Sequence, residues 1–227
     1  MNMRTVVFDL DGTLADTSGD LLAAANAVFS GLGHGNVLDG RDTLVAFQGG
    51  RAMLQAGSDR LNLGWTKADI DRLYPSLLAA YADAIDVYTT LYPGAVDAVQ
   101  ALLDTGHATA ICTNKPEALA ETLLQRLGVR HLFGAMIGAD TLATRKPDAA
   151  PYAAAVERAG GTVARSVLIG DTETDRLTGT AAGVPVVLVT FGPEGAGVAR
   201  LKPEALMHHF DDLGSIVARI FARIDGE

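Results

Sequence analysis

The chain has 227 residues, a length that allows one large domain or a core domain with a smaller second domain. With 48% hydrophobic and 20% charged residues, the composition is typical of a globular protein and excludes a disordered or fibrous one. The net charge of −9 argues against a nucleic-acid partner, because such proteins need clustered Lys and Arg.

The first predicted element is a buried strand at residues 5–8, a short apolar run of mainly β-branched residues. The segment 17–91 then contains helical patterns and no good strand candidate. Apolar residues share one stripe over 21–32 and another over 70–81. We expect Thr17 and Asp20 to cap the first of these helices as a pair.

Strands and helices alternate after Pro93-Gly94. The later predicted strands are continuous apolar runs, as expected for parallel strands covered on both faces, at 108–112, 135–138, 166–169 and 185–189. Helical spacing predicts helices at 118–127 and 151–159, with Gly128 and Gly160 at their ends, where positive φ is needed. A last apolar stripe at 213–224 predicts a helix docked on the core.

This alternation predicts an α/β fold with a doubly wound parallel sheet. The predicted core domain comprises 1–16 and 92–227, and the predicted helical domain comprises 17–91. The single cysteine, Cys112, cannot form an intramolecular disulfide, and its apolar run predicts a buried strand position.

We expect a cytoplasmic protein without a membrane partner. The N-terminus leads directly into a strand-like run, which predicts no signal peptide. No apolar stretch approaches the roughly 18–20 residues needed to span a bilayer. The sequence leaves open whether the protein is a monomer or a homodimer.

Polar motifs follow four of the predicted strands. In chain order they are Asp9-Leu10-Asp11-Gly12-Thr13, Thr113-Asn114, Arg145-Lys146-Pro147 and Gly170-Asp171-Thr172-Glu173-Thr174-Asp175. Ligand sites of parallel sheets lie beyond the carboxyl ends of the strands, so we expect these motifs to converge. The first is the most specific, because two carboxylates so close repel each other unless a cation or a proton joins them.

Together these groups predict phosphoryl-transfer chemistry that depends on Mg²⁺. Several carboxylates around one point suit Mg²⁺, which offsets the repulsion between an anionic nucleophile and an anionic phosphate. A Thr hydroxyl and a Lys ammonium can stabilise the other phosphoryl oxygens. One Asp carboxylate can accept the phosphoryl group, and a second carboxyl group two residues on can exchange protons with the leaving oxygen and with water.

In these motifs the sequence resembles the haloacid dehalogenase superfamily of phosphohydrolases, and the resemblance covers the whole chain. It implies a Rossmann-like core and a small four-helix cap formed by 17–91. Finer features are similar to phosphoglycolate phosphatases, namely Asp16-Thr17, Thr113-Asn114-Lys115-Pro116, Gly170-Asp171-Thr172, Ala181-Ala182-Gly183-Val184-Pro185 and Thr190-Phe191-Gly192.

The resemblance also implies a role for each matching residue. Asp9 would be the nucleophile and Asp11 the general acid and base, while Thr113 and Lys146 would bind phosphate with help from Asn114. Mg²⁺ would be held by Asp9, the backbone carbonyl of Asp11, and Asp171. Asp175 would position Lys146 or a metal-bound water.

Two positions depart from the family pattern. The chain has Lys146-Pro147-Asp148-Ala149 where the family often has Lys-Pro-x-Pro, a difference that affects helix entry. It has Pro193-Glu194-Gly195 where the family often carries Tyr, which bears on substrate choice.

Substrate recognition is expected from the cap, in the glycine-rich stretch 47–51. Gly50 would permit close backbone approach, and Arg51 would pair with the carboxylate of 2-phosphoglycolate or a similar small phosphate ester. The alternative for Arg51 is a solvated side chain at a helix start. Lys115 would either reach the substrate or be a surface charge opening the next helix.

Three other functions share parts of this pattern. A sugar phosphomutase has the same fold and phosphorylated Asp, but Asp20 stands where we would expect a His in such enzymes. A dehalogenase needs neither Asp11 nor Mg²⁺. A phospho-signalling receiver domain lacks a helical insertion after its first strand.

Overall fold

The protein is described by a computed structural model in which residues 3–226 are placed. The chain divides into two compact units. Unit 1 contains the described residues up to Ala15 and those from Leu91 onward, and unit 2 contains Asp16–Thr90. Two short paired strands, β2 (Ala15–Asp16) and β3 (Thr90–Leu91), lie where the chain passes from one unit to the other.

Unit 1 is built on a six-stranded sheet in the order β5-β4-β1-β6-β7-β8, with every neighbouring pair parallel. The strands are β1 (Met3–Phe8), β4 (Ala108–Cys112), β5 (Ala135–Ile137), β6 (Gly161–Gly170), β7 (Val186–Val189) and β8 (Ala205–Met207). The predicted doubly wound parallel sheet is confirmed. The strand order reverses at β1, because β4 lies on one side of it and β6 on the other.

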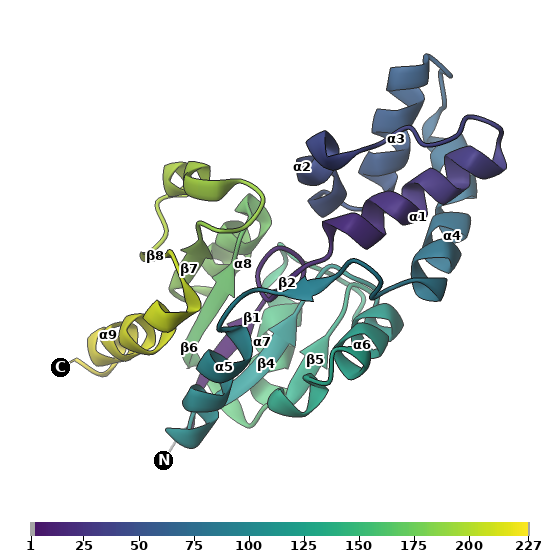
Figure 1. The fold of residues 1–227 in the computed structure, drawn as a ribbon. Coiled ribbons are helices and arrows are strands. Elements are labelled where there is room, and N and C mark those ends of the chain that lie inside the picture. The colour runs from purple at the N-terminus through teal and green to yellow at the C-terminus, as the bar shows by residue number, and fades with distance from the viewer. Residues whose placement is uncertain (1–2, 227) are drawn as a thin grey trace. The chain divides into compact units, whose positions relative to one another are not determined.

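Helices cover both faces of this sheet (Figure 1). They are α5 (Ala95–Asp104), α6 (Glu117–Arg126), α7 (Ala149–Arg158), α8 (Glu173–Ala182) and α9 (Leu213–Asp225). Helices α7 and α8 pack together on one face, where Tyr152 and Val156 meet inward side chains of the central strands. On the other side α5 contacts α9, whose apolar stripe from Leu213 to Phe221 is buried as predicted.

Two strands of the six-stranded sheet differ from the prediction by more than two residues, and the short strands β2 and β3 were not predicted. β6 begins at Gly161, whereas the prediction began at residue 166. The prediction missed the first half of the strand because those residues are only partly buried and form no continuous apolar run. β8 was missed altogether, since a three-residue edge strand leaves too short a pattern to detect. Single-turn 3₁₀ segments occur at Arg130–Leu132 and Phe210–Asp212, and a longer one at Gly195–Leu201.

Unit 2 consists of α1 (Ser18–Gly31), α2 (Thr43–Phe47), α3 (Gly50–Leu61) and α4 (Lys67–Asp83), with a 3₁₀ turn at Gly40–Asp42. Its core includes a stack of Phe29 on Trp65, with ring centroids 5.4 Å apart. Gly57 of α3 packs so closely on this stack that a Cβ atom there would lie 2.2 Å from the Phe29 ring.

The predicted Thr17–Asp20 capping pair is wrong. Thr17 makes no side-chain capping hydrogen bond. The buried carboxylate of Asp20 instead accepts hydrogen bonds from the backbone N–H groups of Tyr88, at 3.0 Å, and Thr89, at 2.8 Å. Asp20 therefore ties the end of unit 2 to the first turn of α1, a partnership that sequence spacing could not reveal.

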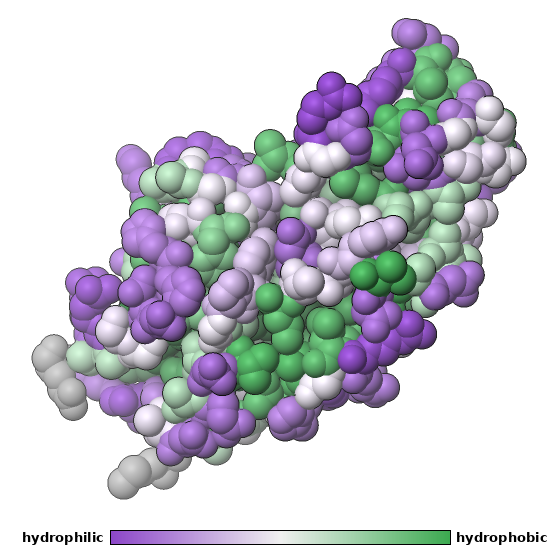
Figure 2. Space-filling view, viewed as in Figure 1, coloured by the Kyte–Doolittle hydropathy of each residue, from purple (hydrophilic) through white to green (hydrophobic). Residues whose placement is uncertain are grey.

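On the face shown in Figure 2, hydrophilic residues (purple) cover much of the surface, and hydrophobic residues (green) gather in patches between them. Between residues 3 and 226, none of the helices combines the length and the apolar composition needed to cross a membrane.

Candidate active site

The candidate site lies at the carboxyl end of β1, where the sheet order reverses. Phe8, the last residue of β1, is in register with Ile111 of β4 and with Ile169 of β6. The backbone N–H of Asp9 then continues the ladder by donating to the carbonyl of Ile169 at 2.9 Å. The residues that follow these three strands therefore meet at one edge of the sheet, which is where ligands bind in doubly wound folds.

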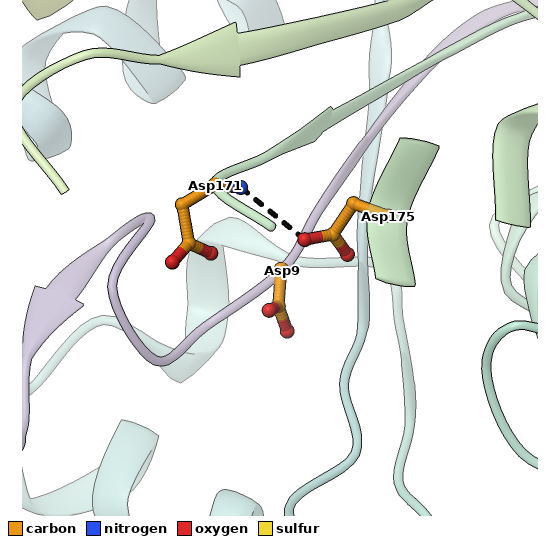
Figure 3. A group of neighbouring side chains, drawn as sticks. All are labelled: Asp9, Asp171 and Asp175. Atoms are coloured by element: carbon orange, nitrogen blue, oxygen red, sulfur yellow. Dashed lines mark hydrogen bonds between the residues drawn. The ribbon is translucent and has the colours of Figure 1, made fainter. Parts of the chain in front are cut away.

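Three buried carboxylates converge at this edge (Figure 3). Asp9 follows β1, Asp171 follows β6, and Asp175 lies in the first turn of α8. One oxygen from each lies within 4.8 Å of the other two. Burial raises the pKa of Asp9 to about 6, assisted by the charges of Asp175 and Asp11 and opposed by Lys146.

Lys146 supplies the compensating charge. Its ammonium lies 2.7 Å from Asp175 Oδ1 and 3.0 Å from Asp9 Oδ1, and its side chain is almost completely buried. Burial alone would lower the pKa of Lys146, but the carboxylates of Asp175 and Asp9 outweigh it and raise that pKa. A buried charge persists only with such partners, so Lys146 stays protonated and organises the cluster.

Asp175 is fully engaged within the protein. Besides the bond from Lys146 to Oδ1, its Oδ2 accepts hydrogen bonds from the N–H groups of Asp171, at 3.2 Å, and Thr172, at 3.1 Å. The Thr172 hydroxyl donates to the same oxygen at 2.7 Å. Asp175 therefore fits the expected positioning role toward Lys146 better than that of a metal ligand.

Asp171 offers the clearest ligand atom for a cation. Its Oδ1 accepts a hydrogen bond from the Thr13 hydroxyl at 2.9 Å, whereas the buried Oδ2 accepts none from any residue between 3 and 226. Burial, followed by the charges of Asp175 and Asp9, raises the pKa of Asp171 well above its ordinary value. A buried carboxylate oxygen without a donor costs free energy that a divalent cation would remove, so the residues present fit Mg²⁺.

Gly12 keeps space open beside that oxygen. Its φ is +81°, and a Cβ atom at this position would lie 2.4 Å from Asp171 Oδ2. The loop is closed by hydrogen bonds from Gly12 N–H to the Ala15 carbonyl, at 2.9 Å, and from Leu14 N–H to the Leu10 carbonyl, at 3.0 Å. The glycine of the first motif is therefore needed both for the turn and for access to Asp171.

Asp11, the expected general acid and base, points toward a different lysine. Its Oδ1 lies 2.7 Å from the ammonium of Lys115. The Lys115 side chain is only 3% exposed, so the expectation of a surface charge at this position is wrong. Nothing in the spacing of the sequence indicated this pair.

The second and third motifs are joined near the same edge. Thr113 is buried, and its hydroxyl oxygen accepts a hydrogen bond from the N–H of Lys115 at 3.2 Å. The Asn114 amide donates to the backbone carbonyl of Lys146 at 3.1 Å. Asn114 thus fixes the segment that carries Lys146, while phosphate binding by Thr113 and Asn114 stays a prediction.

Gly50 and Arg51 lie in the first turn of α3 in unit 2, and both have partners there. A Cβ atom on Gly50 would lie 2.8 Å from the Tyr74 ring, so helix packing accounts for this glycine. The guanidinium of Arg51 lies 3.8 Å from the centre of the Tyr74 ring and pairs with Asp71 at 2.7 Å. Their binding of substrate stays a prediction.

Cys112, at the end of β4, is fully buried, and burial raises the pKa of its thiol to about 12. A thiol in this state is not a nucleophile, in agreement with the predicted structural role.

Comparison with known proteins places these residues in context. Residues 6–189 match the family model described as haloacid dehalogenase-like hydrolase. A phosphoglycolate phosphatase of Mesorhizobium japonicum is 36% identical over 226 residues, which cover 100% of both chains. A phosphoglycolate phosphatase of Agrobacterium fabrum is 35% identical over 218 residues, covering 96% of this chain and 92% of its own.

The fold also resembles a crystal structure described as that of a predicted phosphoglycolate phosphatase from Haemophilus somnus. The TM-score is 0.83 at 23% sequence identity, with 95% of this chain and 98% of the other covered.

We expect Gly12→Ala to weaken Mg²⁺ binding at least about 10-fold without unfolding the protein, because the methyl group would fill the space beside Asp171 Oδ2. Calorimetric titration with Mg²⁺ and circular dichroism measure the two effects. Gly128→Ala is the matched control, since Gly128 also has positive φ, +72°, but has no heavy atom within 4 Å of its Cβ position. Equal Mg²⁺ affinity in wild type and Gly12→Ala would contradict this account of the loop.

Mg²⁺ affinity is expected to fall as the pH decreases from about 7 to about 5. The pKa of Asp9 in the metal-free protein is raised to about 6, so protons occupy a ligand carboxylate below that pH. The same shift means that metal-free folded protein binds more protons than unfolded protein between the ordinary pKa and about 6. The free energy of unfolding without Mg²⁺ should therefore decrease as pH rises through this window. Titration calorimetry at several pH values tests the affinity, and a pH-independent dissociation constant would refute it.

Proposed function

We propose that this chain, which belongs to the haloacid dehalogenase-like hydrolase family, hydrolyses a small phosphate monoester with Mg²⁺ through a phosphoryl group carried on Asp9. The chain is a phosphoric monoester hydrolase. The observation that carries the mechanistic proposal is the convergence of three buried carboxylates beside the buried ammonium of Lys146, with Asp171 Oδ2 left without a hydrogen-bond donor.

We propose 2-phosphoglycolate as the substrate. Relatives that match this chain over nearly its whole length at 35% and 36% identity are phosphoglycolate phosphatases. Family membership also removes the phospho-signalling receiver as an alternative.

Asp9 is suited to nucleophilic attack. With a pKa of about 6 it is mostly ionised at neutral pH, and its pairing with Lys146 fixes the carboxylate at the strand end. An oxygen of Asp9 would attack phosphorus while the bond from phosphorus to the ester oxygen breaks. Asp11 would give its proton to that oxygen, so that the alcohol leaves uncharged.

The second step reverses the proton transfer. The ionised Asp11 would take a proton from water as that water attacks phosphorus, and the bond between Asp9 and phosphorus breaks. Inorganic phosphate leaves and both carboxyl groups return to their starting states. Mg²⁺, held by Asp9, Asp171 and the backbone carbonyl of Asp11, would offset the repulsion between nucleophile and phosphate when bound.

Lys146 has two tasks in this proposal. It pairs with Asp9 and Asp175. Its positive charge would also stabilise the phosphoryl oxygens that bear negative charge in the transition state. Thr113 and Asn114 would add hydrogen bonds to the same oxygens.

A sugar phosphomutase is the main alternative within the family. Asp20, at the position where a His would be expected in such enzymes, is buried and holds the backbone of Tyr88 and Thr89. Its carboxylate is therefore committed to a structural role, and this favours hydrolysis over phosphoryl transfer between sugars.

We expect Mg²⁺-dependent phosphate release from a small set of phosphate esters, with 2-phosphoglycolate among the best, and loss of activity when EDTA removes the metal. Asp9→Asn should lower kcat at least about 1000-fold with folding retained, because an amide is a poor nucleophile. Asp97→Asn, on the exposed surface of α5, is the control and should match wild type. Substantial turnover by Asp9→Asn, or by metal-free enzyme, would refute the mechanism.

Arg51→Ala should raise KM for 2-phosphoglycolate about 10-fold while leaving an aryl phosphate without a carboxylate unaffected. The pair of Arg51 with Asp71 is exposed and contributes little stability, so a substrate carboxylate can replace Asp71. Arg72→Ala removes an exposed arginine of α4 that pairs with Asp69, and it serves as the control. An unchanged KM for 2-phosphoglycolate in Arg51→Ala would exclude this contact.

A further inference from the structure

Lys115 is the buried cation of unit 1 that the proposed reaction leaves without a role. It lies between Asn114 and Pro116, at the start of α6, a place where a lysine usually reaches into water. Here the side chain is 3% exposed, and its ammonium meets Asp11 Oδ1 at 2.7 Å. Burying an ammonium costs several kcal/mol unless partners compensate it, and the Asp11 carboxyl group is one partner of Lys115.

The backbone of Lys115 is fixed on both sides. Its N–H donates to the Thr113 hydroxyl oxygen at 3.2 Å, and its carbonyl accepts from the N–H of Ala139 at 2.9 Å. Pro116 follows with φ −52° and is the N-cap residue of α6. The backbone of Lys115 is thus held by Thr113, just after β4, and by Ala139 in the loop after β5, independently of Asp11.

Asp11 is the most exposed of the four carboxylates at the site. Its side chain is 19% exposed, against 11% for Asp9 and 0% for Asp175. Lys146 fixes Asp9 and Asp175, and Thr13 donates to Asp171. Asp11 lies in the loop after β1, and Lys115 reaches its carboxyl group from the segment after β4.

We propose that Lys115 is a positioning residue that holds the Asp11 carboxyl group where it gives a proton to the leaving oxygen and then takes one from water. The inference rests on the proposed function. Lys115 keeps its own proton in both steps, while the proton moves from Asp11 to the ester oxygen and later from water to Asp11. Such transfers require hydrogen-bond reach, and misplacement by about 1 Å can cost about 100-fold in rate.

The dependence on leaving group distinguishes this role from others. An alkyl ester needs protonation of its leaving oxygen, whereas 4-nitrophenolate leaves readily without a proton. The value of kcat/KM reports the chemistry up to transfer of phosphate to Asp9, and so it isolates the first proton transfer. The two substrates are 4-nitrophenyl phosphate and the alkyl ester that wild type hydrolyses fastest, expected to be 2-phosphoglycolate.

We expect Lys115→Met to lower kcat/KM for the alkyl ester about 30- to 100-fold and that for 4-nitrophenyl phosphate less than about 3-fold. Lys115→Arg, which keeps the charge, should recover part of the loss on the alkyl ester. Lys67→Met removes an exposed lysine from the start of α4 and should equal wild type on both substrates. If Lys115→Met does not fold, Lys115→Gln replaces it, and its loss of kcat/KM should likewise be larger on the alkyl ester than on 4-nitrophenyl phosphate.

A second set of variants shows whether Lys115 acts through Asp11. In an Asp11→Asn background, adding Lys115→Met should cost nothing further on the alkyl ester, because the group that Lys115 positions is already lost. Equal losses on both esters would show a merely structural role and overturn the proposal. An undiminished loss in the Asp11→Asn background would show direct contact with substrate and would also overturn it.

Failure of this inference differs from failure of the proposed function. If wild type hydrolyses no phosphate ester, or if Asp9→Asn retains activity, the phosphatase mechanism itself is wrong. If those two results are as expected but the ratio of the two kcat/KM values is the same in wild type and Lys115→Met, only the role of Lys115 is wrong.

Discussion

The buried ammonium of Lys146 is the interaction on which the site depends. Three carboxylates within 4.8 Å of one another in a buried environment would repel strongly, and desolvation would add to the cost. Lys146 contacts Asp9 and Asp175, the backbone N–H groups of Asp171 and Thr172 donate to Asp175, and the Thr13 hydroxyl donates to Asp171. One positive charge does not balance three negative ones, and the remaining negative charge would favour binding of a divalent cation, as proposed.

The sheet determines where this charge cluster forms. β1 lies between β4 and β6, so the loops after all three strands meet above it. The register of Phe8 with Ile111 and Ile169 aligns the strand ends to within one residue. Gly12 then leaves room beside Asp171 that any side chain would fill. Candidate catalytic groups separated widely along the chain thus converge because parallel strands end at the same edge.

Two lysines divide the work at this edge. Lys146 is paired with Asp9 and Asp175, whereas Lys115 is paired with Asp11. In the proposed mechanism Lys146 would serve the nucleophile and the phosphate, and Lys115 would serve the proton transfer. Both are almost fully buried, so neither is free to exchange partners with solvent. A phosphatase that must protonate an alkoxide and then deprotonate water benefits from holding its nucleophile and its proton carrier with separate cations, since each can then be fixed without disturbing the other.

Much of the fold and of the candidate site was determined by the sequence alone. Continuous apolar runs placed β1, β4, β5 and β7 to within a residue or two, because strands buried on both faces have a composition that local sequence reveals. The spacing within Asp9-Leu10-Asp11-Gly12-Thr13 and the acidic turn at Asp171 indicated the chemistry, because it depends on residue types that local sequence carries.

Only the tertiary structure decided which groups pair. Lys115 and Asp11 are 104 residues apart, and Asp20 and Tyr88 are 68 apart, so neither partnership leaves a periodic signal. From the sequence we expected Gly50 to let the backbone approach a ligand. In the structure, the atoms nearest to its Cβ position belong to side chains of α4. Local sequence determines which helix or strand each segment can form. The partner of a buried charge depends on the tertiary structure, because a charged group loses its hydration, and needs a compensating partner, only when the chain is folded.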